Sequence, residues 1–375
     1  MVRGLGYMKK LFGKKQWKDI FILVILIGIT FLRYNSFKKL EWFLISFIII
    51  AGFTTIYALV YSLYNCKSNK ERKWLSLIYL SSIIFMHPGD CFDVFIYFLV
   101  AAIFLENRDN FLKSYFIIST LIIVITIASY FLEIIPAFDI YGGEIRRMSL
   151  GFANPNSIFR FFFGSLMALY LIDKNKAIFN IYSIAGTVVL YIFTNSRTGL
   201  ICGMLFIILA NLAIIFDKLV DKIHFKWCYL LFALFSVFYI VCFNNHSVLN
   251  DTLSGRPTFL YDILSRADWH LLYGNMTDFK YCDNRIIYLM VRNGCFALVS
   301  VIIFYYFTFR KKTSVELKVL FVMSMIYGLT ENYRALGQTI VPLLCMWSIY
   351  DNYIKNKMDV KNDKNIQKIA NSDKN

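Results

Sequence analysis

Long apolar runs alternate with short polar segments along most of the chain. The runs are longer than barrel strands and lack their alternating polarity, so they predict α-helices. Only helices or closed barrels satisfy the backbone polar groups in lipid, so this pattern is typical of a membrane helix bundle. We predict spans near residues 19–34, 42–64, 74–86, 91–105, 114–135, 157–172, 177–194, 199–216, 227–243, 286–308, 317–329 and 338–350.

Several of these runs are shorter than the ~20 residues that a helix needs to cross a hydrocarbon core of ~30 Å. Residues 74–105 are interrupted by a polar break at 87–90, and residues 317–350 by a similar break at 331–334. Each pair is either two tilted spans or one re-entrant hairpin, and both return the chain to its starting side. The sequence therefore predicts an all-α, polytopic integral membrane bundle of ten to twelve transmembrane helices within residues 1–350.

Composition agrees with this prediction, because 58% of the 375 residues are hydrophobic and only 17% are charged. The net charge of +16 has no soluble basic domain to carry it, so we expect the bilayer and no nucleic acid as its partner. The eight cysteines are scattered and contain no CxxC pair. They indicate small membrane-buried residues, so we expect no metal and no cofactor.

The lysines give the orientation of the bundle. The lysine-rich N-terminal segment and the apolar run at 20–32 resemble a signal peptide, but no small-x-small cleavage site follows, so we expect an uncleaved first span. With a cytoplasmic N-terminus, 23 of 26 lysines fall in inside segments and only Lys38, Lys39 and Lys280 fall outside. Residues 351–375 are predicted to form a basic, disordered cytoplasmic tail. We expect a multi-pass protein of the bacterial cytoplasmic membrane with both termini in the cytoplasm.

The arginines are distributed differently from the lysines. A single arginine near an interface is usually an anchor whose charged end reaches the lipid headgroups. Arginine also binds phosphate and carboxylate in a bidentate manner and stays charged when partly buried. So many arginines on one face of the membrane favour a site for a phosphate-bearing substrate. Nine of the fourteen lie in or beside outward segments: Arg146, Arg147, Arg160, Arg197, Arg256, Arg266, Arg285, Arg292 and Arg334.

The first outward segment, residues 138–160, contains a turn at 154–157 that leads into a helix. Proline restricts the residue before it, and asparagine or serine caps a following helix. One interpretation is an ordinary junction between a loop and a helix. The other is an anion-binding site in which Asn154, Asn156 and the helix N-terminus lie beside Arg160, one turn further on.

The second outward segment is the tight turn Asn195-Ser196-Arg197-Thr198-Gly199 between two long spans. It places Arg197 between two hydroxyl groups at the start of a helix, where an unpaired charge would be costly.

The third outward segment is a large extracytoplasmic loop of about 244–285 that contains Arg256, His270 and Asp283. Loops longer than ~15 residues are usually functional or disordered, and the aromatic residues of this one predict short surface helices.

Four motifs in these segments, in this order, resemble those of bacterial polysaccharide repeat-unit polymerases, which belong with the O-antigen ligases. The resemblance covers roughly residues 146–294. The motifs are Arg-x-x-x-Gly-Phe-x-Asn-Pro-Asn from Arg147 to Asn156, the Asn-Ser-Arg-Thr-Gly turn, Leu-Ser-Gly-Arg ending at Arg256, and Asp283-Asn284 followed by Tyr288 and Gly294.

The resemblance implies a glycosyl transfer on the outer face of the cytoplasmic membrane. Members of this family join oligosaccharide repeat units that are carried on undecaprenyl pyrophosphate, for capsule, exopolysaccharide or O-antigen. A hydroxyl group of the acceptor sugar attacks the anomeric carbon of the donor, and undecaprenyl pyrophosphate leaves. The reaction implies no metal and no nucleotide sugar. A chain-length regulator and a repeat-unit flippase are candidate partners.

Together the residues and the resemblance predict a site. We expect Arg197 and Arg256 to bind the pyrophosphate of the leaving group, and Asp283 to act as the base where the related ligases have a histidine. Glu331 either completes the cavity with Arg334 or forms a structural pair with it, and His270 is a second candidate base. The other expected substrate-binding residues are Arg146, Arg147, Asn154, Asn156, Arg160, Ser196, Asn284, Arg285, His270 and Arg334.

Three alternatives stay open at the level of sequence. The first is a ligase that moves a finished glycan to another acceptor, against which the missing histidine argues. The second is a transporter or flippase of the same lipid-linked sugar, which usually has internal repeats and charges in mid-membrane. The third is a structural membrane protein, which does not explain the arginines on one face.

Overall fold

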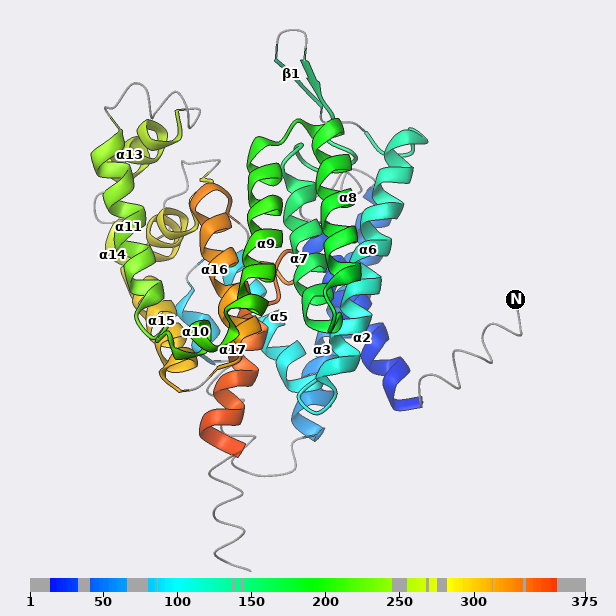
Figure 1. Ribbon diagram of the computed structural model, residues 1–375. Helices are drawn as coiled ribbons and strands as arrows, with labels where there is room; N and C mark the ends of the chain where they lie inside the picture. The colour runs from blue at the N-terminus through cyan, green and yellow to red at the C-terminus, as the bar shows by residue number, and fades with distance from the viewer. Residues whose placement is uncertain are drawn as a thin grey trace, which may run out of the picture.

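The computed structural model describes residues 14–32, 41–65, 80–85, 87–136, 139–142, 145–244, 255–267, 270–274, 282–311, 313–332 and 335–355. These residues form helices and a single two-stranded hairpin (Figure 1). The helices up to α8 are α2 (Lys14–Leu32), α3 (Glu41–Asn65), the 3-10 turn η2 (Ser82–Ile84), α5 (Pro88–Ile103), α6 (Arg108–Phe131), α7 (Ser157–Ile172) and α8 (Ala177–Thr194). The later ones are α9 (Arg197–Ile215), α10 (Asp217–Lys222), α11 (Cys228–Phe243), α13 (Arg256–Arg266), α14 (His270–Tyr273), α15 (Arg285–Arg310), α16 (Val315–Thr330), α17 (Val341–Tyr350) and the π-helical turn η3 (Asp351–Lys355).

Four of the described helices, α6, α8, α9 and α15, are long and apolar enough to cross a membrane. Others, such as α7 and α11, are equally apolar but have 16 residues each. The all-α prediction is confirmed, and the apolar helices indicate a membrane protein. The described helices do not establish the larger number of ten to twelve spans.

The packing of the apolar side chains agrees with a lipid-facing surface. Phe179 and Phe206 are fully buried and pack edge-on against each other, with ring centroids 5.2 Å apart. On the same two helices, Ile181, Ile192 and Ile215 are about 70% exposed, at 71%, 68% and 69%. Aliphatic side chains so exposed on an apolar helix are what a bilayer stabilises and water does not.

The turn between α8 and α9 is the one that the sequence singled out. Asn195 ends α8 in the left-handed conformation with φ 46°, which asparagine tolerates better than most residues. The Ser196 side chain then caps α9 by accepting a hydrogen bond from the Gly199 amide at 3.3 Å. The predicted spans 157–172 and 177–194 lie on either side of segment 173–176. They coincide with α7 and α8.

A hairpin of β1 (Ile140–Gly142) and β2 (Ile145–Arg147) projects from one end of the bundle, at the top of Figure 1. We call this the hairpin end, and it also carries α13. The sequence predicted only a loop here, because strands of three residues carry too short a pattern to detect.

Two predicted elements differ from the structure. The polar break at 87–90 is the start of α5: Pro88 takes the first helical position, and the His87 side chain accepts a hydrogen bond from the Gly89 amide at 3.2 Å. The predicted straight span 286–308 is broken, because Gly294 has a non-helical φ of 82° inside α15. A Cβ at Gly294 would stand 2.4 Å from the Leu272 carbonyl oxygen of α14, so only glycine allows this close approach.

Candidate functional site

A buried carboxylate at the hairpin end organises the residues that the sequence singled out. Glu331 follows α16, and its side chain is only 1% exposed. Its Oε2 accepts hydrogen bonds from Arg160 Nη2 at 2.6 Å and Arg160 Nε at 3.2 Å. Its Oε1 accepts a hydrogen bond from Asn156 Nδ2 at 3.0 Å. Glu331 therefore ties the start of α7 to the end of α16.

Arg256 also approaches this carboxylate, and Arg147 is connected to it through Asn156. Arg256, the first residue of α13, places Nη2 3.6 Å from Glu331 Oε1 and Nε 3.6 Å from Asp283 Oδ2. Arg147 donates from Nη2 to Asn156 Oδ1 at 2.9 Å and from Nε to the Thr194 carbonyl oxygen at 3.1 Å. We call Arg147, Asn156, Arg160, Arg256, Asp283 and Glu331 the arginine cluster.

Arg197 lies beside the arginine cluster and is exposed. Burial lowers the pKa of Arg147, Glu331 raises it, and the positive charges of Arg197 and Arg256 lower it again. Arg197 therefore lies close enough for its charge to act on Arg147. Among the residues that the structure describes, no carboxylate forms an ion pair with Arg197.

The charge of Glu331 depends on the arginines around it. Burial raises the pKa of the Glu331 carboxyl, and Arg160 opposes this effect. Asp283 raises the pKa further, while Arg256 lowers it. Counting Arg197, four guanidiniums surround the carboxylates of Glu331 and Asp283, so the positive charges outnumber the negative ones by two.

Three polar side chains that the sequence assigned to substrate binding instead support the backbone. Asn154 Oδ1 accepts from the amides of Asn156 and Ser157 at 2.9 and 3.0 Å. The Ser196 hydroxyl caps α9 and is 1% exposed. Asn284 is fully buried, caps α15 through Oδ1, and donates from Nδ2 to the Leu329 carbonyl oxygen at 3.3 Å. Ser196 and Asn284 are buried, whereas Asn154 is only partly buried.

The remaining expected residues lie elsewhere or outside the description. Arg146 turns away from the arginine cluster and pairs with Asp139 at 2.6 Å. Arg285 lines a separate cavity. His270 begins α14, but its side chain lies outside what the structure describes, as does all of Arg334. The proposed pair between Arg334 and Glu331 is therefore not described, whereas the pair with Arg160 is.

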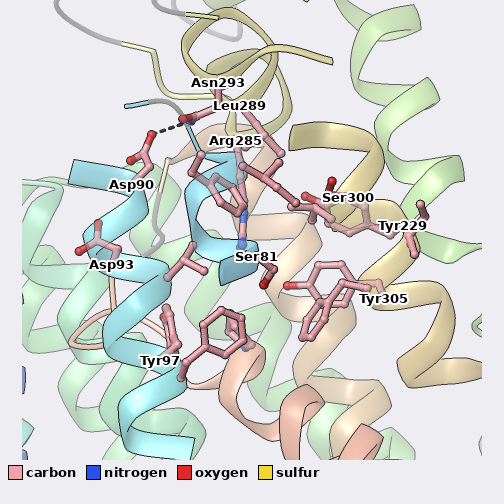
Figure 2. A pocket seen from close by; sticks show the side chains of 18 of the residues that line it. Ser81, Asp90, Asp93, Tyr97, Tyr229, Arg285, Leu289, Asn293, Ser300 and Tyr305 are labelled. Atoms are coloured by element: carbon pink, nitrogen blue, oxygen red, sulfur yellow. Dashed lines mark hydrogen bonds between the residues drawn. The ribbon is translucent and has the colours of Figure 1, made fainter. Parts of the chain in front are cut away.

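The cavity beside the arginine cluster has a volume of about 400 Å³ and is lined by α5, α11, both halves of α15 and α17. Figure 2 shows Asp90 and Asp93 of α5 on one side, Tyr229 and Tyr305 on the other, and Arg285 between them. Asp90 is 4% exposed and Asp93 2%. We call this cavity the α15 cavity. The sequence analysis missed both aspartates, although their spacing of three residues places them on one face of a helix.

No group of three or more histidine, cysteine or carboxylate side chains that could hold a metal ion occurs within the described ranges. Comparison of the chain with protein-family models, with curated proteins and with solved structures gave no match. The site therefore has to be interpreted from its own geometry.

Asp139 clamps the base of the hairpin that carries Arg147. Its side chain, 3% exposed, accepts hydrogen bonds from Arg146 Nε at 2.9 Å, the Tyr130 hydroxyl at 2.8 Å and the Ser149 amide at 2.8 Å. Burial opposes the ionisation of Asp139, but the Ser149 amide, Arg146 and Tyr130 outweigh it and lower the pKa.

We expect Asp139→Asn to lower the free energy of unfolding by about 2 kcal/mol at neutral pH, because a charged acceptor of several hydrogen bonds is lost. The folded pKa lies below the unfolded one, so this stabilisation is complete above the unfolded pKa and disappears as the pH falls through the folded pKa. Denaturant unfolding of both proteins in detergent, followed from pH 7 downwards, measures this. A difference that stays constant at acidic pH would contradict the ionised clamp.

Proposed function

We propose that the chain is a membrane glycosyltransferase that joins oligosaccharide repeat units carried on a polyprenyl pyrophosphate, as a polysaccharide polymerase does. The observation that supports this most is the arginine cluster, which gathers Arg147, Arg160 and Arg256 around Glu331 at one end of an apolar bundle. In this proposal the hairpin end faces outward, ten to twelve spans cross the bacterial cytoplasmic membrane, and both termini lie in the cytoplasm.

The charge balance of the arginine cluster fits a pyrophosphate. Together with Arg197 beside it, the arginine cluster has two surplus positive charges, which call for an anion of similar magnitude, and guanidiniums bind phosphate oxygens through paired hydrogen bonds. Arg197 is exposed and Arg256 is partly exposed, at 22% of its side chain, so both are open to a ligand. In a glycosyl transfer, the bond between the anomeric carbon and the pyrophosphate breaks and leaves negative charge on the phosphate. Guanidiniums already in place stabilise that charge in the transition state.

Asp283 is the candidate base of this reaction. Its side chain is 41% exposed and lies beside Arg256, whereas Glu331 is enclosed by hydrogen-bond donors. The acceptor hydroxyl oxygen forms a bond to the anomeric carbon, and its proton passes to the Asp283 carboxylate. Arg256 lies between the two carboxylates and so holds the base next to the pyrophosphate.

We expect Asp283→Asn to reduce the rate of polymerisation by about 100-fold or more, because general base catalysis contributes ~10²–10⁴-fold. Asparagine has nearly the same volume and keeps a polar oxygen beside Arg256, so binding of the lipid-linked donor should change little. The rate in membranes that contain the variant, measured against pH, separates the two effects. Full activity with an unchanged pH profile would remove Asp283 as the base.

A transporter of the same lipid-linked sugar is the second candidate, and the buried Asp90 and Asp93 favour it. Buried carboxylates inside a membrane bundle often mark a translocation pathway. A transporter usually has charges in mid-membrane, and Asp90 and Asp93 are two buried carboxylates of this kind. The two functions differ in what accumulates when the chain is lost.

The test is a bacterial strain from which the chain has been deleted. If the chain is a polymerase, the deleted strain should accumulate single repeat units on lipid at the outer face, where an enzyme added outside the cells can reach them. If the chain is a transporter, the deleted strain should accumulate these units at the inner face, where they are protected from that enzyme. Normal long polysaccharide in the deleted strain would contradict both functions.

A further inference from the structure

The α15 cavity offers mostly carbon to a ligand, and several of its polar groups are occupied by hydrogen bonds within the protein. Asp90 accepts from Asn293 Nδ2 at 2.6 Å and from the Tyr288 hydroxyl at 3.5 Å. The Tyr97 hydroxyl donates to the Thr339 carbonyl oxygen at 2.7 Å. The wall also contains Asp93, Arg285 and Asn332, but most of its exposed area is apolar and comes from Ile84, Phe85, Val94, Phe98, Leu289, Val301, Ile303, Phe304, Pro342 and Met346. Such a wall favours a hydrocarbon over a sugar.

The charged and the aromatic parts of the α15 cavity lie at different levels of α16. Arg285 packs beside the hairpin end of α16, where a Cβ on Gly328 would stand 3.5 Å from its Cβ. Tyr305 packs on Phe321, with ring centroids 4.9 Å apart, and stacks on Tyr229 at 4.6 Å. Seven residues of helix separate Gly328 from Phe321, which is about 10 Å at ~1.5 Å per residue. The charge is at the hairpin end, and the aromatic wall lies deeper.

Two segments of the chain contribute neighbouring residues to the arginine cluster and to the α15 cavity. Asp283 belongs to the arginine cluster, and Arg285, two residues later, lines the cavity. Glu331 belongs to the arginine cluster, and the next residue, Asn332, lines the cavity. A ligand with an anionic head and an apolar chain therefore meets complementary surroundings at both of its ends.

We propose that the α15 cavity binds the prenyl chain of the lipid whose pyrophosphate lies at the arginine cluster. This rests on the proposed function, because the surplus positive charge matches a pyrophosphate better than the single phosphodiester of a phospholipid. Residues on both sides of the break at Gly294 line the cavity, so both halves of α15 would contact the prenyl chain. The volume of about 400 Å³ lies within the range of ~300–1,000 Å³ that ligand pockets have.

The test is photolabelling of the purified full chain in lipid nanodiscs with a polyprenyl pyrophosphate that carries a diazirine within its prenyl chain. We expect the label on Tyr229, Phe304 and Tyr305. The cavity-filling variant Val301→Phe should reduce this labelling at least tenfold. Val299→Phe is the matched control, because Val299 lies two residues away on α15 and is 51% exposed. Equal labelling of the two variants would overturn the proposal.

A second variant separates a hydrocarbon from a polar ligand. The Tyr229 hydroxyl is buried and has no hydrogen-bond partner among the residues that the structure describes. A prenyl chain does not need this hydroxyl, so Tyr229→Phe should be labelled as strongly as the wild type. A loss of labelling would show that binding in the cavity depends on this hydroxyl and would overturn the proposal.

Competition by unlabelled lipids on the wild type tests the proposal even if Val301→Phe does not fold. Excess unlabelled polyprenyl pyrophosphate should remove the label from the cavity residues, and excess phosphatidylglycerol should not. Displacement by phosphatidylglycerol would show an ordinary bilayer lipid and overturn the proposal. The assay contains no sugar, so its outcome is independent of polymerisation. A deleted strain that lacks polymer, together with an unlabelled cavity, would refute this inference and leave the proposed function standing.

Discussion

Replacing Glu331 by glutamine is expected to lower the free energy of unfolding by about 3–5 kcal/mol, because it removes the only carboxylate that contacts the Arg160 guanidinium in the described part of the chain. Arg160 is 11% exposed, so its largely buried charge would lose the carboxylate that lies 2.6 Å away. Glutamine keeps the volume and still accepts the hydrogen bond from Asn156. The loss therefore reports the charge. Denaturant unfolding in detergent measures it.

Asp262→Asn is the matched control for this prediction. It also removes one carboxylate from an arginine pair, but Arg266 and Asp262 are 70% and 47% exposed. Exposed pairs contribute only about 0–1 kcal/mol, so this variant should unfold almost like the wild type. Similar losses for both variants would show that Glu331 does not organise the arginine cluster.

Arg256→Ala is expected to reduce polymerisation by about 100-fold or more, because Arg256 lies between Asp283, the proposed base, and Glu331 and is proposed to bind the pyrophosphate. Removal of one group that stabilises transition-state charge typically costs ~10²–10³-fold. Arg256→Lys should recover only part of the activity, since lysine keeps the charge but loses the paired hydrogen bonds of the guanidinium. Chain length of the polysaccharide and the amount of single repeat units on lipid, measured in the same cells, report the effect.

The control for Arg256 lies on the same helix. Arg266 is in the last turn of α13, 70% exposed, and forms an ion pair with Asp262 four residues earlier. Arg266→Ala should therefore make polysaccharide of normal length. Equal defects in both variants would mean that α13 acts through its folding or through its overall charge, and Arg256 would lose its assigned role.

The sequence predicted the local elements well because their patterns are local. The bounds of α7 and α8 follow from apolar runs that end in polar turns, and the structure has them at the same residues. The start of α5 also carried a local signal, since Pro88 occupies the first position that helices favour for proline. The break in α15 did not, because the conformation of Gly294 depends on the approach of α14.

The sequence also pointed to Arg147, Arg160 and Arg256, which the structure brings together, and it named Glu331 with Arg334 but not as the partner of Arg160. Glu331 is 171 residues from Arg160, and nothing local relates the two. Asn154, Ser196 and Asn284 were assigned to substrate because polar residues in outward turns suit both binding and capping. Only the structure shows that their side chains are used for capping. Whether the arginine cluster binds substrate stays a prediction.

The central claim is that the chain itself forms the glycosidic bond at the arginine cluster. The most direct measurement is reconstitution of the purified chain in liposomes with lipid-linked repeat units extracted from the deleted strain. We expect a ladder of longer glycans on lipid, with one polyprenyl pyrophosphate released for each unit added, and almost none of either with Arg256→Ala. Repeat units that cross the bilayer without joining, or a ladder that Arg256→Ala makes equally well, would contradict it.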